Sequence, residues 1–126
     1  MCACFSGDHH MKKLAIAAAS FLFATVSAWA DPSGTYAFEG VELDGTPYKG
    51  ELEIAKVGDV YALTYTFDDS SVQEGSAIGD DDFLAYSYGD DEETGVGLMT
   101  AEGDSWEGVW TKLGADKMST ETWTRK

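Results

Sequence analysis

The sequence predicts an all-β fold, an antiparallel up-and-down barrel of eight strands preceded by a signal helix. Three observations lead to this prediction. After residue 30, apolar residues recur with a period of two, and no window keeps helical spacing for three turns. Gly and Asp clusters interrupt this alternation about every ten residues. The interruptions are too short for a crossover helix, so neighbouring strands should pair antiparallel. A closed barrel removes exposed strand edges, and a sandwich is the alternative.

Residues 11–30 have the pattern of a cleaved secretory signal. Lys12 and Lys13 form a positive region, a short apolar stretch follows, and Ala28-Trp29-Ala30 offers the small residues that signal peptidase requires. The apolar stretch of roughly 13 residues is too short to span a bilayer, which takes about 20. Residues 1–10 carry no Lys or Arg, and we expect them to be a misassigned upstream extension. Residues 31–126 then form one secreted or periplasmic barrel domain.

Each expected strand shows an apolar face. Tyr36 alternates with smaller residues in the first strand, and Leu52 alternates with acidic neighbours in the second. The third strand is the clearest, with four large apolar side chains on the face of Tyr65, whereas the fourth is weaker and interrupted by Gly75. The first four strands are expected at residues 34–41, 48–56, 60–67 and 72–78.

The second half of the chain repeats this pattern. The fifth strand is clear and the sixth follows it directly, while the seventh places Trp106, Gly108 and Trp110 on one face. In the last strand, three threonines alternate with Glu121, Trp123 and Arg125. The last four strands are expected at residues 83–88, 95–101, 105–111 and 118–125. Glycines inside the strands fit the sharp coiling of a small barrel. The turns are expected at Asp44-Gly45, Gly58-Asp59, Asp68-Asp69-Ser70, 79–82, 89–93 and Gly103-Asp104.

The residue inventory excludes most catalytic chemistry. Both cysteines and both histidines lie in residues 1–10, so the exported chain would hold no thiol, disulfide or imidazole. Catalytic Ser-His-Asp and Cys-His arrangements need an imidazole, and zinc sites normally use His or Cys. Only a carboxylate pair such as Glu107 and Glu121 could support hydrolysis of a glycoside. We therefore expect a protein that is not an enzyme and has no cofactor.

The charge of the chain restricts its partners. Residues 31–126 contain 22 acidic and 6 basic residues. Such a surface repels phosphate backbones and anionic headgroups, so we expect neither nucleic acid nor membrane binding after signal cleavage. Residues 80–82 and 90–93 supply oxygen ligands that suit Ca²⁺, but neither stretch follows the twelve-residue calcium loop. Solvated turns at opposite ends of the barrel are the simpler interpretation, and no metal site is predicted.

The aromatic face supplies the candidate ligand-binding residues. A barrel of eight strands is either just filled by side chains or holds one small ligand, and the sequence leaves both open. A pocket at one mouth would grip an apolar or planar ligand between aromatic walls. Arg125 either pairs with Glu121 or faces a ligand carboxylate. The predicted site consists of Tyr61, Tyr65, Trp106, Trp110, Trp123 and Arg125.

Glycine and aromatic motifs along residues 31–126 carry a resemblance to a known group of proteins. They include Tyr48-x-Gly50-x-x-x-Ile54, Gly58-x-x-Tyr61-x-Leu63-x-Tyr65, Gly75-x-x-Ile78-Gly79, Gly103-x-x-Trp106-x-Gly108-x-Trp110 and Thr120-Glu121-x-x-Thr124-Arg125. This pattern resembles small secreted bacterial proteins that are often labelled fibronectin-binding, whose layout is similar to avidin- and lipocalin-like barrels. The resemblance implies an extracellular protein-binding role; the biotin-binding residues of avidins are not recognisable.

Two binding functions follow from these observations. The first is a secreted or periplasmic acidic barrel that binds a small ligand at its mouth. The alternative is an extracellular protein-interaction module, an adhesin or a protease inhibitor, that acts through its acidic outer surface. The sequence does not decide the oligomeric state.

Overall fold

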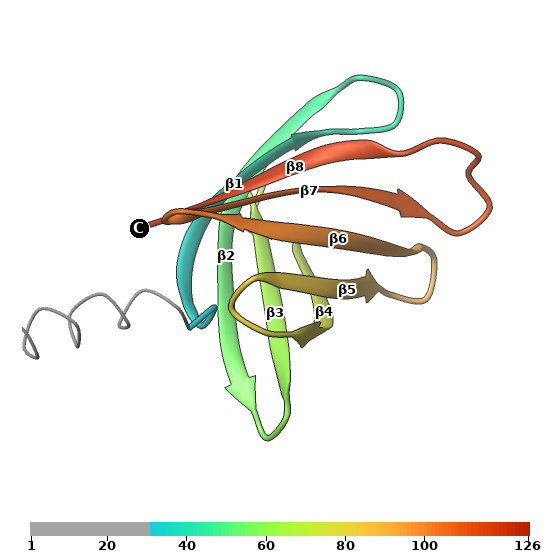
Figure 1. Ribbon diagram of the computed structural model, residues 1–126. Helices are drawn as coiled ribbons and strands as arrows, with labels where there is room; N and C mark the ends of the chain where they lie inside the picture. Colours follow the sequence, from blue (N-terminus) through green and yellow to red (C-terminus); the bar gives the residue numbers. More distant parts are fainter. Residues whose placement is uncertain (1–30) are drawn as a thin grey trace, which may run out of the picture. The chain divides into compact units, whose positions relative to one another are not determined.

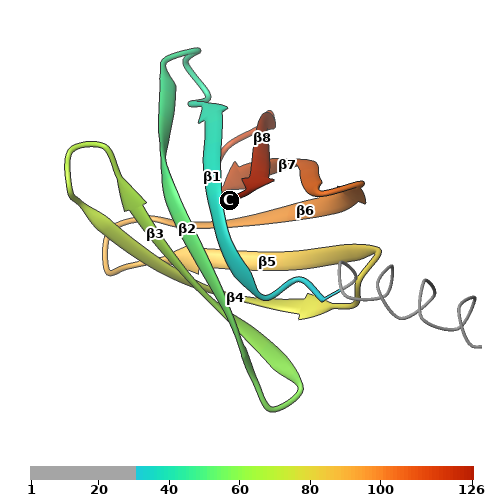
Figure 2. The ribbon, with the colours of Figure 1, turned by 90° about the vertical axis from the view of Figure 1, so that its left-hand side faces the viewer.

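The computed structural model describes residues 31–126, which form a closed barrel of eight strands (Figures 1 and 2). The expected signal segment and upstream extension lie outside the described residues. The strands are β1 (Gly34–Val41), β2 (Pro47–Val57), β3 (Val60–Phe67), β4 (Val72–Gly79), β5 (Phe83–Gly89), β6 (Thr94–Glu102), β7 (Ser105–Lys112) and β8 (Ser119–Arg125). Every boundary lies within one residue of the expected one.

The topology confirms the up-and-down barrel. Each strand pairs antiparallel with the next, and β1 pairs with β8 to close the sheet, with Phe38 opposite Trp123. The sandwich alternative is therefore wrong. Among residues 31–126, no helix is long and apolar enough to span a membrane.

The period-two pattern places one face of every strand inside the barrel. In β2, Leu52 and Ile54 are buried whereas Glu51 and Glu53 are exposed, and β8 likewise buries Glu121 and Trp123. Alternating burial follows directly from the pleat of a strand, in which successive side chains point to opposite faces. The inward faces of the eight strands form a single core rich in aromatic side chains.

Glycines inside the strands allow the sheet to coil tightly. A Cβ atom at Gly50, Gly75 or Gly108 would collide with a backbone carbonyl oxygen of the neighbouring strand, Thr66, Ser87 or Leu98 respectively. At Gly97 the added atom would meet the ring of Tyr86 instead. The expected role of strand glycines in a small barrel is thus confirmed by the close approach of neighbouring backbones.

One end of the barrel is filled. The turns at Gly58-Asp59, residues 80–82 and Gly103-Asp104 lie at this closed end, together with the segment that precedes β1. Arg125 donates hydrogen bonds to the carbonyl oxygens of Asp31 (2.8 Å) and Ser33 (3.0 Å). Its guanidinium lies 4.8 Å from the centre of the Tyr36 ring, and the Tyr36 hydroxyl donates to the Pro32 carbonyl at 2.6 Å. Residues 31–33 therefore pack on the closed end, where the Tyr36 side chain is fully buried.

Candidate functional site: the mouth cavity

The opposite end of the barrel is hollow. At this end β1 joins β2, β3 joins β4, β5 joins β6 and β7 joins β8. A cavity of about 390 Å³ opens there, and we call it the mouth cavity. Its walls combine aromatic side chains from the strands with acidic side chains from the connections. The lining residues are Glu42, Tyr48, Tyr65, Phe67, Asp69, Ser71, Val72, Gln73, Tyr86, Tyr88, Asp90, Glu93, Trp110 and Glu121.

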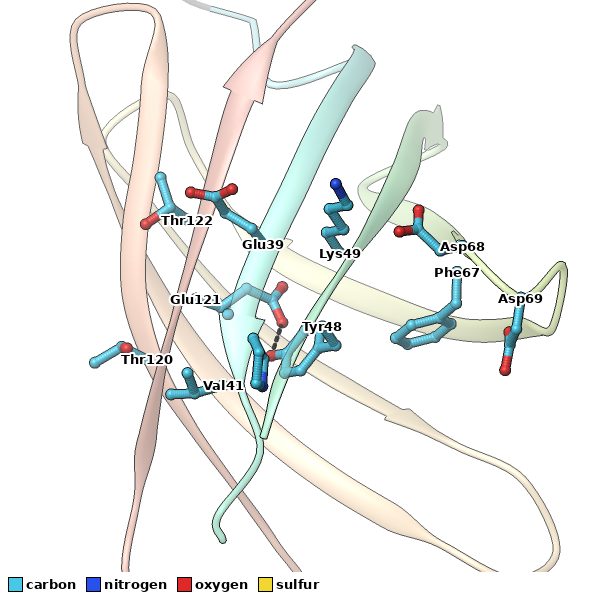
Figure 3. Close-up of a pocket in the computed structure, with 12 residues that line it drawn as sticks. Glu39, Val41, Tyr48, Lys49, Phe67, Asp68, Asp69, Thr120, Glu121 and Thr122 are labelled. Carbon is cyan, nitrogen blue, oxygen red and sulfur yellow. Dashed lines mark hydrogen bonds between the residues drawn. The ribbon is translucent and has the colours of Figure 1, made fainter. Parts of the chain in front are cut away.

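Glu121 is the only buried charged side chain among residues 31–126, with 5% of its surface exposed. Its carboxylate accepts hydrogen bonds from the hydroxyls of Tyr48 (2.6 Å) and Tyr65 (3.3 Å) and from the indole N–H of Trp123. Figure 3 shows Glu121 and Tyr48 pointing toward each other from β8 and β2. These donors satisfy three of about four acceptor positions of a carboxylate, so they fix its orientation.

Gly40 makes the contact between Tyr48 and Glu121 possible. In the sheet register, Gly40 on β1 lies opposite Tyr48 on one side and opposite Glu121 on the other. A Cβ atom at Gly40 would lie 2.6 Å from the Tyr48 hydroxyl oxygen. The missing side chain therefore leaves the space in which the tyrosine hydroxyl reaches the carboxylate.

Burial controls the protonation of these groups. Loss of solvent raises the pKa of Glu121, while the hydrogen bonds from Tyr48, Trp123 and Tyr65 act in the opposite direction. Burial, together with the charge of Glu121, raises the pKa of the Tyr48, Tyr65 and Tyr86 phenols well above the ordinary value. The phenols therefore stay protonated, and the hydroxyls of Tyr48 and Tyr65 donate to Glu121.

Trp110 contributes a polar atom that lacks a partner within residues 31–126. Only 5% of the residue is exposed, and its indole Nε1 is buried without a hydrogen-bond acceptor. The ring lies between two tyrosines, with centroids 6.2 Å from Tyr48 and 6.1 Å from Tyr88. A buried N–H without an acceptor costs about 1–3 kcal/mol, so a ligand that supplies an acceptor would gain this energy.

The structure divides the six predicted site residues between the two ends of the barrel. Tyr65 and Trp110 line the mouth cavity. Trp123 lies beneath it and donates to Glu121. Tyr61, Trp106 and Arg125 do not line the cavity, because they occupy the parts of β3, β7 and β8 nearest the closed end.

Sequence reasoning missed three tyrosines of the cavity wall, Tyr48, Tyr86 and Tyr88. Each lies on the inward face and within four residues of a connection at the mouth. The sequence does contain a signal for them. Inward-facing residues that lie close in sequence to the connections at one end of the barrel are expected to line a cavity at that end.

Two possibilities considered for Glu121 do not hold. It forms no pair with Arg125, because Arg125 binds the N-terminal backbone at the closed end. It also cannot act together with Glu107, because Glu107 is exposed on the outer face of β7 whereas Glu121 points into the barrel. The two carboxylates therefore lie on opposite sides of the wall and do not flank one substrate.

A second depression lies beside the mouth, along β8, β1, β2 and the end of β3 (Figure 3). It measures about 800 Å³ and shares Tyr48, Phe67, Asp69 and Glu121 with the mouth cavity. The rest of its lining comes largely from outward-facing residues of the strands, including Glu39 and Lys49. It is a surface groove, whereas the aromatic lining of the mouth cavity comes from inward-facing side chains of the strands.

The two acidic stretches lie at opposite ends of the barrel, as expected from their positions on either side of β5. Within residues 31–126, one group of carboxylates is close enough to hold a metal ion. It comprises Asp80, Asp81 and Asp82, whose ligand atoms lie within 4.8 Å of one another, and all three are exposed. Asp80 and Asp90 each use Oδ1 to accept backbone N–H groups two and three residues later, which explains these aspartates as turn residues.

No protein-family model and no curated protein matches the sequence. Solved structures do match: a redesigned β-barrel, mFAP1, bound to DFHBI, is 16% identical with a TM-score of 0.60, covering 79% of this chain and 97% of that one. A fluorescence-activating β-barrel designed de novo is 18% identical with a TM-score of 0.56 and the same coverage. These matches show the fold, an eight-stranded barrel, and lend no support to the fibronectin-binding label.

Proposed function

We propose that this protein is a non-catalytic binding protein that holds one small organic molecule in the mouth cavity. The observation that carries the proposal is the division of the barrel into a filled end and a hollow end. A protein that needed only a stable core would gain by filling both ends, because unfilled space costs packing energy.

The size and chemistry of the cavity support this function. Its volume of about 390 Å³ lies within the usual range for small-molecule sites, roughly 300–1,000 Å³. Aromatic side chains are typical of the walls of such sites, and here they alternate with polar groups that could orient a ligand. Tyr65 and Trp110, both selected from the sequence, would contact the ligand. The structurally similar barrel mFAP1 was solved bound to a small molecule, DFHBI.

The proposed location is the periplasm or the exterior of the cell. The signal pattern of residues 11–30 supports export, and the 22 acidic residues of the domain suit a soluble carrier. Core packing alone would hold such a domain together, since residues 31–126 contain no cysteine.

Native mass spectrometry of the purified protein after incubation with a metabolite extract tests the function. We expect an added mass of a few hundred daltons that is lost on denaturation. Gln73→Trp, which places an indole in the cavity, should abolish the added mass. Ser76→Trp, on the exposed outer face of the same strand, is the matched control and should retain it.

An added mass that both variants retain would contradict the proposed site. A chain that retains no small molecule at all would instead favour the alternative function, a protein-interaction module that uses the acidic outer surface.

A further inference from the structure

The rim of the mouth cavity is strongly acidic. The four connections at this end, residues 42–46, 68–71, 90–93 and 113–118, contain nine acidic residues and one basic residue, Lys117. Lys112, at the end of β7, adds a second base and is paired with Glu93 at 3.0 Å. Negative charge at the entrance of a low-dielectric cavity concentrates cations there and repels anions.

The floor of the cavity places the carboxyl group of Glu121 among aromatic rings. Glu121 is held by three donors and is in contact with the cavity, while Tyr48, Tyr86, Tyr88 and Trp110 supply ring surfaces around it. The faces of aromatic rings attract organic cations, with about 2 kcal/mol or more for a desolvated contact. A buried carboxylate and surrounding aromatic faces therefore prefer the same kind of ligand.

We propose that the ligand of the mouth cavity is an organic cation, an ammonium group on a small, partly apolar body that also carries a hydrogen-bond acceptor. This inference rests on the proposed binding function and names its ligand class. The ammonium group would lie near Glu121 against the aromatic walls. The acceptor would take the hydrogen bond that the buried Nε1 of Trp110 offers and that no group in residues 31–126 receives.

A hard metal ion fits this cavity poorly. Ca²⁺ takes six to eight oxygen ligands at about 2.3–2.6 Å. Both oxygens of Glu121 already accept hydrogen bonds from tyrosine or tryptophan, and much of the remaining wall is aromatic. A weakly hydrated ammonium group needs no such ligand shell, and the aromatic faces can take the place of its water.

The charge of the ligand can be tested with three molecules of the same shape. Choline carries a quaternary ammonium and a hydroxyl, 3,3-dimethylbutan-1-ol is its neutral isostere, and 3,3-dimethylbutanoate is an anion with the same tert-butyl group. Each is titrated into the purified full chain while the indole N–H signals are followed by NMR. We expect choline to shift the Trp110 signal and to bind at least about tenfold more tightly than the neutral isostere.

Variants separate the charge from the shape of the site. Glu121→Gln removes the buried charge and should weaken choline binding by about tenfold or more. Because this change also disturbs buried hydrogen bonds, the double variant Glu42→Gln/Glu93→Gln provides a second test at the rim, with an expected loss of about threefold. Asp81→Asn/Asp82→Asn removes two charges at the closed end and should leave choline binding unchanged.

The outcomes distinguish this inference from the function on which it rests. Equal or tighter binding of the neutral or anionic probe overturns the cation inference and leaves small-molecule binding intact. A neutral or anionic molecule recovered from the metabolite extract does the same, whereas a recovered amine supports the inference. If no probe binds and the extract yields no ligand, both proposals fail.

Discussion

Removal of the Tyr48 hydroxyl should destabilise the protein in a way that depends on pH. This hydroxyl donates to Glu121 at 2.6 Å, and hydrogen bonds to charged groups contribute roughly 1.5–3 kcal/mol. Because Tyr48 is only half-buried, we expect Tyr48→Phe to lower the free energy of unfolding by roughly 1.5–2 kcal/mol at neutral pH. Tyr36→Phe is the matched control, because the Tyr36 hydroxyl donates at the same distance to a neutral acceptor, the Pro32 carbonyl. The control should cost about 1 kcal/mol.

The difference between the two variants should vanish in acid. Burial raises the pKa of Glu121 above the ordinary value of 4.5, so the carboxyl group is protonated by about pH 4 and Tyr48 then donates to a neutral group. The assay is urea unfolding of both variants and the original chain at about pH 8 and about pH 4, followed by tryptophan fluorescence. Equal costs for Tyr48→Phe at both pH values would refute the assignment of a charged Glu121 as the acceptor.

Two further predictions concern stability. Since the pKa of Glu121 is raised in the folded state, its contribution to stability is fully present below pH 4.5 and is lost as the pH rises through the folded-state pKa. Glu121→Gln should remove this decline from a pH series of urea midpoints, and an unchanged pH dependence would contradict the assignment. Gly108→Ala should cost at least about 1–3 kcal/mol, because the new Cβ meets the Leu98 carbonyl oxygen. Gly103 lies in a turn with φ +66° and open space around it, so Gly103→Ala should lower the free energy of unfolding by only about 1 kcal/mol. A larger loss for Gly103→Ala than for Gly108→Ala in urea unfolding would show that the close approach of backbones is unimportant.

The fold could be predicted from the sequence because its information is local. Each strand alternates with a period of two and each connection carries its own Gly or Asp residues, so strand number, boundaries and antiparallel pairing follow without knowledge of distant contacts. The glycines within strands added the expectation of tight coiling, which Gly108 and its contact with β6 confirm.

The position of a residue along the barrel axis was harder to predict. Trp106 and Trp110 share the inward face of β7, but only Trp110 lines the cavity. Alternation tells inside from outside and carries no information on which end of the barrel is filled. At the closed end, residues 31 and 33 bind Arg125 on the neighbouring strand β8, a contact between residues more than 90 positions apart that local patterns do not reveal.

Glu121 shows how a broken pattern can point to a site. Its neighbours on the inward face of β8, Ser119 and Trp123, would fit an ordinary small barrel, but a carboxylate in this position has to be withdrawn from water. Such a charge costs several kcal/mol unless hydrogen bonds compensate, and Tyr48, Tyr65 and Trp123 supply them. An apolar side chain would have filled the same space without needing any hydrogen-bond donors. The acid and its donors therefore contribute less to stability than an apolar core would, and what they add is a carboxyl group held in a fixed orientation at the floor of an aromatic cavity.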